Sequence, residues 1–424
     1  MKVNMNVDVR HLTRVEGHGN IHIEVKDGAL VQARWEVVET PRFFEAMLRG
    51  VSHNDAPVLT SRICGICSIG HTLASLRAVE QAMGITIPKT ALKLRLLAKH
   101  GETLQSHFLH LFFLAAPDFL NAGSVAPLME SHPELMAGVI RLRGMANTLC
   151  DLIAGRTTHP VSLVVGGVSK APEKARLMDL RKAIEQRMED AMAGFEFFKT
   201  VTIPDFTRET EFVSLKGDNK YPWIGGDLIS SDGVIKGERD YLAMTNEYKV
   251  DFSTSKFTKL SRDSFAVGAL ARINNNHLFL RDQAKDIAHA LGLEPVSHNP
   301  FMQNAAQLAE CFHVMEDSIE IINELLDGSM DEIRTDYEVR SGEGVGAVEV
   351  PRGILFHHYV IDDKGLITKA NCIIPTTQNN ANIHYDLNAL VAQETGKGTE
   401  SPDITRLCEM LVRAYDPCIS CSVH

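Results

Sequence analysis

Hydrophobic and polar residues alternate along the first forty residues and then change to a helical period. Residues 3–40 alternate as in strands, and "NIHIEVKDGALVQARWEVVE" predicts a hairpin that turns at Asp27-Gly28. From about 55 to 200, apolar residues recur at the three- and four-residue spacing of amphipathic helices. Glycine and proline mark the predicted helix boundaries: one helix ends at Gly84, the next runs from Pro88 to Leu114, and another begins at Pro172.

The whole pattern predicts an α+β fold, mainly α, with a long central helical bundle and peripheral β-hairpins. We find no internal repeat and no low-complexity linker, so we expect one domain over 1–424. A second hairpin is predicted to turn at "DDKG". The expected segments are a β-rich N-terminal segment (1–54), a helical bundle (55–200), a mixed insertion (201–280), a helical segment (281–340), a β-hairpin (341–384) and a helical C-terminal segment (385–424).

Composition narrows the class of protein only modestly. The chain has 424 residues, 44% of them hydrophobic and 23% charged, which is typical of a globular protein. Its net charge of -11 argues against nucleic acid as a partner. The N-terminus has no apolar signal-peptide core, and the most apolar run, "LQSHFLHLFFLAAPDFL", is too short for a bilayer. We therefore expect no membrane span and a cytoplasmic location.

Four of the eight cysteines form two Cys-x-x-Cys pairs, Cys64 with Cys67 and Cys418 with Cys421. The pairs lie near opposite ends of the chain, so a common function requires the fold to bring the ends together. The other cysteines stand singly in apolar stretches, where buried inert thiols in a reducing compartment are expected. They are Cys150, Cys311, Cys372 and Cys408.

The cysteine spacing by itself leaves three alternatives. Two thiolates three residues apart can bind one metal ion, and two such pairs would provide four sulfur ligands. On this motif alone, structural zinc ranks first. A dithiol redox pair ranks second, because the βαβ context of thioredoxin-type motifs is absent, and chance co-occurrence ranks third.

The residues around the cysteines favour a different metal. "RICGICSIGH" (62–71) and "DPCISCSVH" (416–424) resemble the paired signatures of the nickel-iron hydrogenase large, catalytic subunit. The similarity includes four further motifs in family order: "RVEGHG" (14–19), "PRFFEAMLRG" (41–50), "EVPRGIL" (349–355) and "IIPTTQNNAN" (373–382). These motifs span nearly the whole chain. The chain looks most like the cytoplasmic, multi-subunit members of the family.

The resemblance implies a buried bimetallic site where the N- and C-terminal segments meet. By position, Cys64 and Cys418 would be terminal nickel thiolates. Cys67 and Cys421 would bridge nickel to an iron that carries carbon monoxide and cyanide. The implied reaction is the reversible, heterolytic cleavage of dihydrogen into two protons and two electrons. We expect the Cys418 thiolate to act as the base, with Arg352 as the alternative.

Other matching residues surround the expected site. Glu16 matches the glutamate that relays protons outward, although without the resemblance we would favour a strand-end Glu paired with Arg14 or with solvent. His71 matches a histidine that hydrogen-bonds a bridging sulfur. Asp416 and Pro417 match residues that shape the pocket above nickel, and the dipeptide is also an ordinary turn signal.

A second metal site is implied beside the first. Glu45, the backbone carbonyl of Cys372 and the terminal His424 match ligands of magnesium or iron; an imidazole ligand favours iron. Without the resemblance, Glu45 would be an ordinary surface acid and His424 a frayed end. The end at His424 also matches the family's maturation, in which an endopeptidase removes a tail after nickel insertion.

Three further features receive a structural interpretation. His107 and His110 share a helix face, and satisfied buried histidines are favoured over a metal pair. Ser106 stands where respiratory members of the family typically carry Asp. The glycine-rich stretches at 342–348 and 164–169 lack the strand–loop–helix context of a nucleotide site, so we expect structural turns.

The expected reaction requires partners. With four cysteines at the bimetallic site, no iron–sulfur run such as Cys-x-x-Cys-x-x-Cys remains. The resemblance implies an iron–sulfur small subunit and further diaphorase or ferredoxin-type subunits, with nicotinamide, deazaflavin, ferredoxin or heterodisulfide as acceptor. A hydrogen-sensing subunit would have the same motifs and is the alternative function. The related quinone-pocket subunit of respiratory complex I lacks the four cysteines, and a zinc-stapled non-enzymatic protein would bind zinc without nickel.

Overall fold

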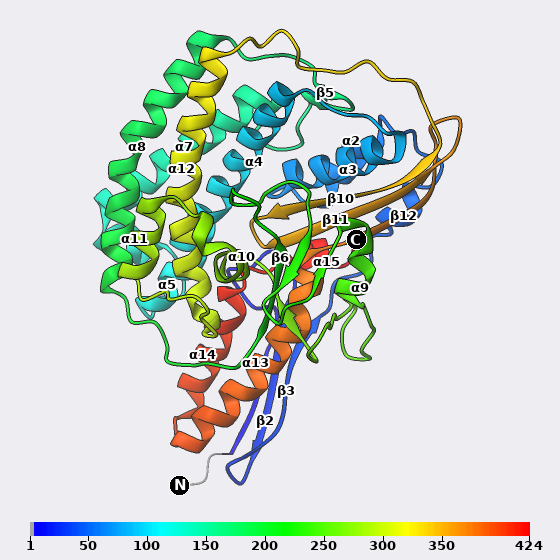
Figure 1. The fold of residues 1–424 in the computed structure, drawn as a ribbon. Coiled ribbons are helices and arrows are strands. Elements are labelled where there is room, and N and C mark those ends of the chain that lie inside the picture. Colours follow the sequence, from blue (N-terminus) through cyan, green and yellow to red (C-terminus); the bar gives the residue numbers. More distant parts are fainter. Residues whose placement is uncertain (1–3) are drawn as a thin grey trace.

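A bundle of long helices occupies one side of the molecule, and small sheets with further long helices packed against them occupy the other, in the computed structural model, which describes residues 4–424 (Figure 1). The first three residues of the expected β-rich segment lie outside the described residues. The predicted α+β class, with a helical bundle and peripheral hairpins, is confirmed. The long helices are α3 (Ser68–Met83), α4 (Lys89–Leu109), α7 (Pro133–Ala154), α8 (Lys174–Thr200), α12 (Gln303–Asp327), α13 (Pro375–Lys397) and α14 (Ser401–Ala414).

Helices α4, α7, α8 and α12 pack against one another as the central bundle (Figure 1). The side chains of Leu97, Leu142 and Phe312 are fully buried in its core. The helix predicted from Pro88 to Leu114 changes after α4 into a π-helical stretch, η2 (His110–Ala115). The shorter helices are α1 (Phe44–Met47), α2 (Ala56–Thr60), α5 (Ala116–Phe119), α6 (Ala126–Ser131), α9 (Tyr241–Thr245), α10 (Ala269–Asn276), α11 (Asp282–Ala290) and α15 (Ile419–Ser422).

The N-terminal sheet is the antiparallel meander β1 (Met5–Val9), β2 (Gly19–Lys26) and β3 (Ala29–Val37). Asp27 and Gly28 have φ of 52° and 78°, the positive values that a two-residue type I′ turn requires, so the predicted hairpin is confirmed. Helix α13 lies against β3, where the buried Trp35 indole donates a 3.0 Å hydrogen bond to Asn380 Oδ1 (Figure 1). This contact joins the first and last parts of the chain.

The second sheet consists of β10 (Gly342–Val350), β11 (Gly353–Ile361) and β12 (Ile367–Ile373). The expectation of turns at 342–348 was wrong, because this stretch is strand β10, packed across α3. A Cβ at Gly346 would lie 2.0 Å from the carbonyl oxygen of Ala74, so the glycines permit the strand to approach the helix backbone. At 164–169 the predicted turn is found, between β4 (Leu163–Val164) and β5 (Gly167–Val168).

The segment predicted as mixed contains short strands and loops. Its strands lie side by side in one sheet, in the order β8 (Ile235–Lys236), β7 (Leu228–Ser230), β6 (Glu211–Leu215) and β9 (Phe265–Ala266). Helix α13 begins at Pro375, ten residues before the expected start of the C-terminal helical segment, because Pro375 takes the first helical position after the extended Ile374. This early start places the "PTTQNNAN" stretch inside a buried helix.

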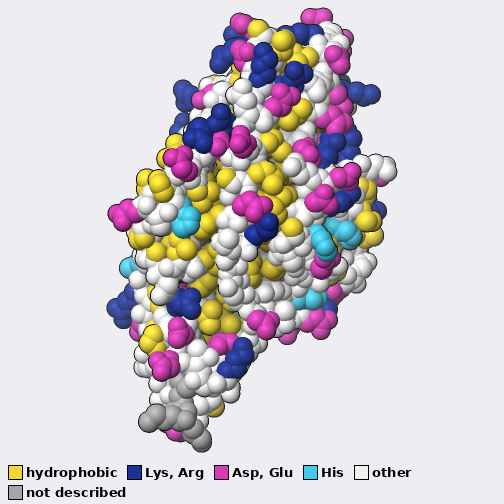
Figure 2. All heavy atoms as spheres, turned by 90° about the vertical axis from the view of Figure 1, so that its left-hand side faces the viewer, with side chains coloured by type: hydrophobic (Ala, Val, Ile, Leu, Met, Phe, Trp, Pro, Cys, Tyr) yellow, Lys and Arg dark blue, Asp and Glu magenta, His cyan; other side chains and the backbone are white. Residues whose placement is uncertain are grey.

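The face over the helical bundle carries interspersed acidic and basic side chains with hydrophobic groups between them (Figure 2). Exposed hydrophobic side chains of the bundle include Ile140 and Met178. Within residues 4–424, no helix combines the length and the apolar character needed to cross a membrane.

Candidate metal centre

The two Cys-x-x-Cys pairs meet in the interior of the molecule. Cys64 follows a short 3₁₀ turn, η1 (Ser61–Ile63), Cys67 caps the N-terminus of α3, and Cys418 caps that of α15. The sulfur atoms of all four cysteines lie within 4.8 Å of one another, and all four residues are buried. Within the described chain, this is the one group of three or more His, Cys, Asp or Glu side chains found with donor atoms arranged to hold a metal ion.

Hydrogen bonds between side chains and backbone groups hold the two cysteine loops in place. The Arg42 guanidinium donates to the carbonyl of Ile63 at 2.7 Å and to that of Ser420 at 2.6 Å, so one side chain joins the residues that precede Cys64 and Cys421. The Cys418 amide donates to Thr376 Oγ1 at 2.9 Å. Sequence reasoning missed Arg42 and Thr376, although both lie in motifs that it quoted.

The four sulfurs provide the donor set that a nickel–iron group requires. Soft sulfur donors favour late or low-valent metals, and a buried cluster of thiolates needs a nearby cation. The hydrogen bond with Cys67 lowers the pKa of the Cys64 thiol, and the Arg352 charge lowers it further against the effect of burial. In the structure a disulfide joins Cys418 and Cys421, so metal binding by all four sulfurs requires this pair to be reduced.

Arg352 is held rigidly beside the cysteines. Its Nε donates to the Asp416 carbonyl at 2.5 Å and its Nη2 to Asp416 Oδ1 at 2.8 Å. Burial lowers the pKa of the guanidinium, but Asp416 and the cysteine sulfurs raise it more strongly, so Arg352 stays protonated. Nη1 donates to Ser106 Oγ at 3.4 Å. Pro417, between Asp416 and Cys418, is buried.

Glu16 lies against the C-terminal cysteine loop. The Ser420 amide donates to Glu16 Oε2 at 3.1 Å, the Ser420 hydroxyl donates to Oε1, and the Ile419 amide donates to the Glu16 carbonyl at 2.9 Å. The competing pairing with Arg14 is not found, because the Arg14 guanidinium pairs with Asp118 at 2.5 Å. Glu16 is half-buried, with contacts to the metal-binding loop on one side.

The three groups expected at the second metal site converge. The His424 imidazole Nε2 lies 2.7 Å from the Cys372 carbonyl oxygen and 3.7 Å from Glu45 Oε1, and the Cys372 amide donates to the same Glu45 oxygen at 2.8 Å. Burial raises the pKa of the Glu45 carboxyl, but the contacts with His424 and Cys372 outweigh it and lower the pKa below its ordinary value. The His424 side chain is 5% exposed, so this residue is packed, not frayed.

His71 lies one turn after Cys67 on α3, with its Nδ1 3.0 Å from His357 Nε2. The helical histidines interpreted as satisfied are hydrogen-bonded: His107 pairs with Glu310 at 2.8 Å, and His110 contacts Gln307 at 2.6 Å and the Arg413 carbonyl at 2.7 Å. Neither ring lies in a group of metal-ligating side chains.

The structure shows a buried ion pair near the cysteines that the sequence pattern did not reveal. Glu102 Oε2 lies 3.2 Å from Lys99 Nζ, and Glu102 Oε1 accepts the Gly70 amide at 2.8 Å. Burial raises the pKa of Glu102 and lowers that of Lys99. Their three-residue spacing on an amphipathic helix resembles a surface pair, so only the packing of α4 behind α3 shows that both are buried.

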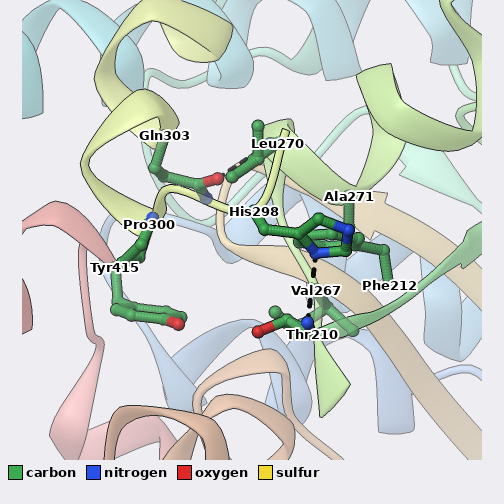
Figure 3. Close-up of a pocket in the computed structure, with 10 residues that line it drawn as sticks. Thr210, Phe212, Val267, Leu270, Ala271, His298, Pro300, Gln303 and Tyr415 are labelled. Atoms are coloured by element: carbon green, nitrogen blue, oxygen red, sulfur yellow. Dashed lines mark hydrogen bonds between the residues drawn. The ribbon is translucent and has the colours of Figure 1, made fainter. Parts of the chain in front are cut away.

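A separate small cavity lies between β6, α10 and the chain before α12 (Figure 3). Its volume is about 10 Å³, close to the room that one water molecule occupies. The Gln303 carboxamide accepts the Leu270 amide at 2.8 Å, and the His298 ring accepts the Thr210 amide at 3.1 Å on its walls. None of the four paired cysteines lines it, so this cavity is distinct from the metal centre.

The fold brings four buried sulfurs together in a site that could hold a metal group. A family model described as nickel-dependent hydrogenase matches residues 42–137 and 216–424, and one described as HoxL-like matches residues 6–40. The chain belongs to the nickel-dependent hydrogenase family, as the large, catalytic subunit of a nickel–iron hydrogenase. The ranking of zinc that the cysteine spacing suggests by itself is therefore wrong for this chain.

The similarity extends over the whole length of known relatives. The chain is 33% identical to the sulfhydrogenase 2 subunit alpha of Pyrococcus furiosus over 99% of both chains. It is 29% identical to the NAD-reducing hydrogenase HoxS subunit beta of Cupriavidus necator, with 97% of this chain and 93% of the relative covered. A crystal structure of an NAD⁺-reducing [NiFe]-hydrogenase in the H₂-reduced state has a TM-score of 0.88 at 30% identity, covering 99% of both chains.

Proposed function

We propose that this subunit catalyses the reversible, heterolytic cleavage of dihydrogen into two protons and two electrons. The observation that carries the proposal is the convergence of four buried cysteine sulfurs within 4.8 Å in a chain of the nickel-dependent hydrogenase family. Cys64 and Cys418 would bind nickel alone, and Cys67 and Cys421 would bridge nickel to an iron with carbon monoxide and cyanide ligands. When bound, this group supplies Lewis-acid polarisation of dihydrogen and a store for its electrons.

The residues of the chain would hold and move the proton. The Cys418 sulfur is the proposed base, and the Arg352 guanidinium, fixed by Asp416, would present N–H donors beside it. Glu16 would take the proton outward, because its backbone is joined to the Cys418 loop and its carboxylate to Ser420. This arrangement supports a short path from a sulfur to a half-buried carboxylate.

We further propose a second metal, magnesium or iron, bound by Glu45, the Cys372 carbonyl and His424. Their convergence supports this site, because the carbonyl oxygen, the carboxylate and a deprotonated Nε2 of His424 would each supply a lone pair to a cation bound between them. A cation there would neutralise Glu45 and fasten the last residue beside the four-sulfur centre.

An electron-accepting partner would carry the electrons away from the four-sulfur site. The cysteines outside the pairs are buried, and residues 4–424 show no second group of metal-ligating side chains; these cysteines are Cys150, Cys311, Cys372 and Cys408. The relatives are named as subunits of larger hydrogenases, one of them NAD-reducing. We propose an iron–sulfur small subunit, with diaphorase or ferredoxin-type subunits beyond it, in the cytoplasm.

The test is an infrared spectrum of the purified enzyme together with its metal content. Bands of iron-bound carbon monoxide and cyanide, with about one nickel per chain, are expected. A nickel-loaded sample without these bands would overturn the proposed group. Rapid turnover of hydrogen with an artificial acceptor would distinguish the catalyst from a sensor that has the same metal ligands.

A further inference from the structure

A fully buried arginine, Arg272, lies between two carboxylates where α10, α12 and β10 meet. Arg272 belongs to α10, Glu310 to α12 and Glu349 to β10, and all three side chains are 0% exposed. Nε and Nη2 of the guanidinium donate to the two carboxylate oxygens of Glu310 at 2.6 and 2.7 Å. Nη1 donates to Glu349 Oε2 at 3.0 Å. Three elements that are separate in the chain therefore share one guanidinium.

The same guanidinium reaches the turn that contains Arg352. Val350 ends β10 and pairs with Gly353, the first residue of β11, so Pro351 and Arg352 form the two-residue connection. Arg272 Nη1 donates to the Val350 carbonyl at 2.9 Å, and Nη2 donates to the Pro351 carbonyl at 3.2 Å. With the two carboxylates, these carbonyls give each of the five guanidinium N–H groups an acceptor. Buried turn carbonyls need a donor from the protein, and Arg272 supplies it immediately before Arg352.

The charges of this cluster favour a role in geometry over one in stability. Burial lowers the pKa of the Arg272 guanidinium, but Glu310 and Glu349 raise it more strongly, so Arg272 stays protonated. Burial raises the pKa of Glu310, but Arg272 lowers it further, so the carboxylate is ionised. A buried ion pair gives little net stability compared with apolar side chains of similar volume, because both charges lose their hydration. Five directed hydrogen bonds do fix the positions of the groups that accept them.

We propose that Arg272 is a positioning residue for Arg352. Arg272 fixes the backbone of the turn, while Asp416 fixes the guanidinium at the other end of the Arg352 side chain. The inference rests on the proposed function, in which Arg352 presents N–H donors beside Cys418. Arg272 acts through the turn alone, because all five of its own N–H groups are already engaged.

The first test compares Arg272→Lys with Arg95→Lys in the nickel-loaded enzyme. Arg95 is the matched control, because its buried guanidinium donates to both oxygens of Glu80 and to the carbonyls of Val164 and Gly167, none of which belongs to the β10–β11 turn. In both variants a compact ammonium replaces a planar group with five donors. Turnover per nickel should fall by about 10-fold or more in Arg272→Lys, since a small displacement of a reacting group lowers the rate steeply. It should stay near the wild-type value in Arg95→Lys, and equal losses in the two variants would overturn the inference.

A double-mutant cycle separates positioning from general destabilisation. If Arg272 acts through Arg352, adding Arg272→Lys to Arg352→Lys should lower turnover per nickel no further. A loss as large as that in the wild-type background would contradict this coupling.

A crystal structure of the Arg272→Lys holoenzyme gives a readout that does not depend on turnover. We expect the turn to be displaced and the contacts between Arg352 and Asp416 to be longer, with the four cysteines in place. An Arg352 side chain in its wild-type position would overturn the inference.

A milder variant covers the case in which Arg272→Lys retains no nickel. In Glu349→Gln the amide keeps one oxygen, whereas Glu349 accepts from both the Leu215 amide and Arg272, so one of these bonds is lost. Turnover per nickel should fall by a smaller factor, and again no further in the Arg352→Lys background; a full additional loss there would overturn the inference.

Failure of the proposed function has separate signatures. Absence of carbon monoxide and cyanide bands from the wild-type enzyme would overturn the metal group, and unchanged turnover in Arg352→Lys alone would overturn the role of Arg352. In either case the crystal structure of Arg272→Lys still decides whether Arg272 holds the turn.

Discussion

The Arg352 guanidinium contacts Asp416 twice, through Nε to the backbone carbonyl at 2.5 Å and through Nη2 to Oδ1 at 2.8 Å. Asp416 has a positive φ of 49° and stands two residues before Cys418. The two contacts fix the direction in which the remaining guanidinium N–H groups point. A residue in the turn between β10 and β11 is thereby oriented by the loop that carries half of the cysteine cluster.

Arg352→Lys is expected to lower turnover by about 10²-fold or more while nickel and iron are retained. A lysine has one compact ammonium group and cannot reproduce the two-point contact with Asp416. The measurement is hydrogen-dependent dye reduction, normalised to nickel content. Unchanged turnover would show that Arg352 has no catalytic role.

Glu16→Gln is expected to lower the rate of exchange between hydrogen and solvent protons by about 10²-fold or more, while para/ortho conversion of hydrogen continues. The amide can still accept from Ser420, and the backbone bond to Ile419 does not depend on the side chain, so the fold at the cysteines should persist. Mass spectrometry of hydrogen isotopes measures both reactions. Survival of both would mean that protons leave by another route.

Glu45→Gln is expected to weaken binding of the second metal by at least about 10-fold. The variant removes the negative charge beside His424 but keeps an oxygen that can accept the Cys372 amide. Metal analysis of the purified protein and titration with magnesium and iron(II) measure the change. Glu130→Gln, at an exposed position, is the matched control; equal metal contents in the two variants would argue against a ligand role for Glu45.

Stability is expected to fall as the pH decreases from about 6.5 toward 4. Burial lowers the pKa of His100 to about 3 and that of His313 to about 4, against 6.5 in the unfolded chain. Below pH 6.5 the unfolded chain therefore binds protons that the folded chain does not, and each histidine can contribute a slope of at most about 1.4 kcal/mol per pH unit. The loss should level off near the folded-state pKa values.

Thermal unfolding midpoints between pH 7.5 and 4.5 measure this dependence. His100→Gln should make the decrease of the midpoint with falling pH less steep, because one buried titrating group is removed. His11→Gln, at an exposed position, is the control and should leave the slope unchanged. A slope in His100→Gln equal to that of the wild type would show that His100 does not contribute.

Gly346→Ala is expected to destabilise the fold by about 3 kcal/mol, because the new Cβ would lie 2.0 Å from the Ala74 carbonyl oxygen and neither backbone can yield easily. Displacement of α3 would also move Cys67, so nickel content should decrease. Thermal unfolding and metal analysis measure both effects. Gly123→Ala is the control, since nothing lies within 4 Å of its Cβ position; similar midpoints for the two variants would contradict the packing argument.

Turns and helix ends could be predicted from the sequence where neighbouring residues alone determine the backbone conformation. The turn at Asp27-Gly28 and the stop of α3 at Gly84 depend on residues that tolerate positive φ, and both were predicted correctly. The glycines of β10 were misinterpreted as turns. Glycine has no side chain, so it is suited both to a turn and to a close contact between a strand and a helix. Which of the two applies is decided by α3, more than 250 positions away in the chain.

The sequence by itself supplied the two cysteine pairs, the candidate residues Arg352 and Glu16, and the motifs that identify the family. It could not determine how Arg42 joins the two cysteine loops, how Glu102 and Lys99 come to be buried together, or that His357 faces His71. Those contacts link residues that are distant in the chain or that resemble surface residues locally. Residue types set which interactions are possible, and only the packing of α3, β11 and the C-terminal loop decided which of them form.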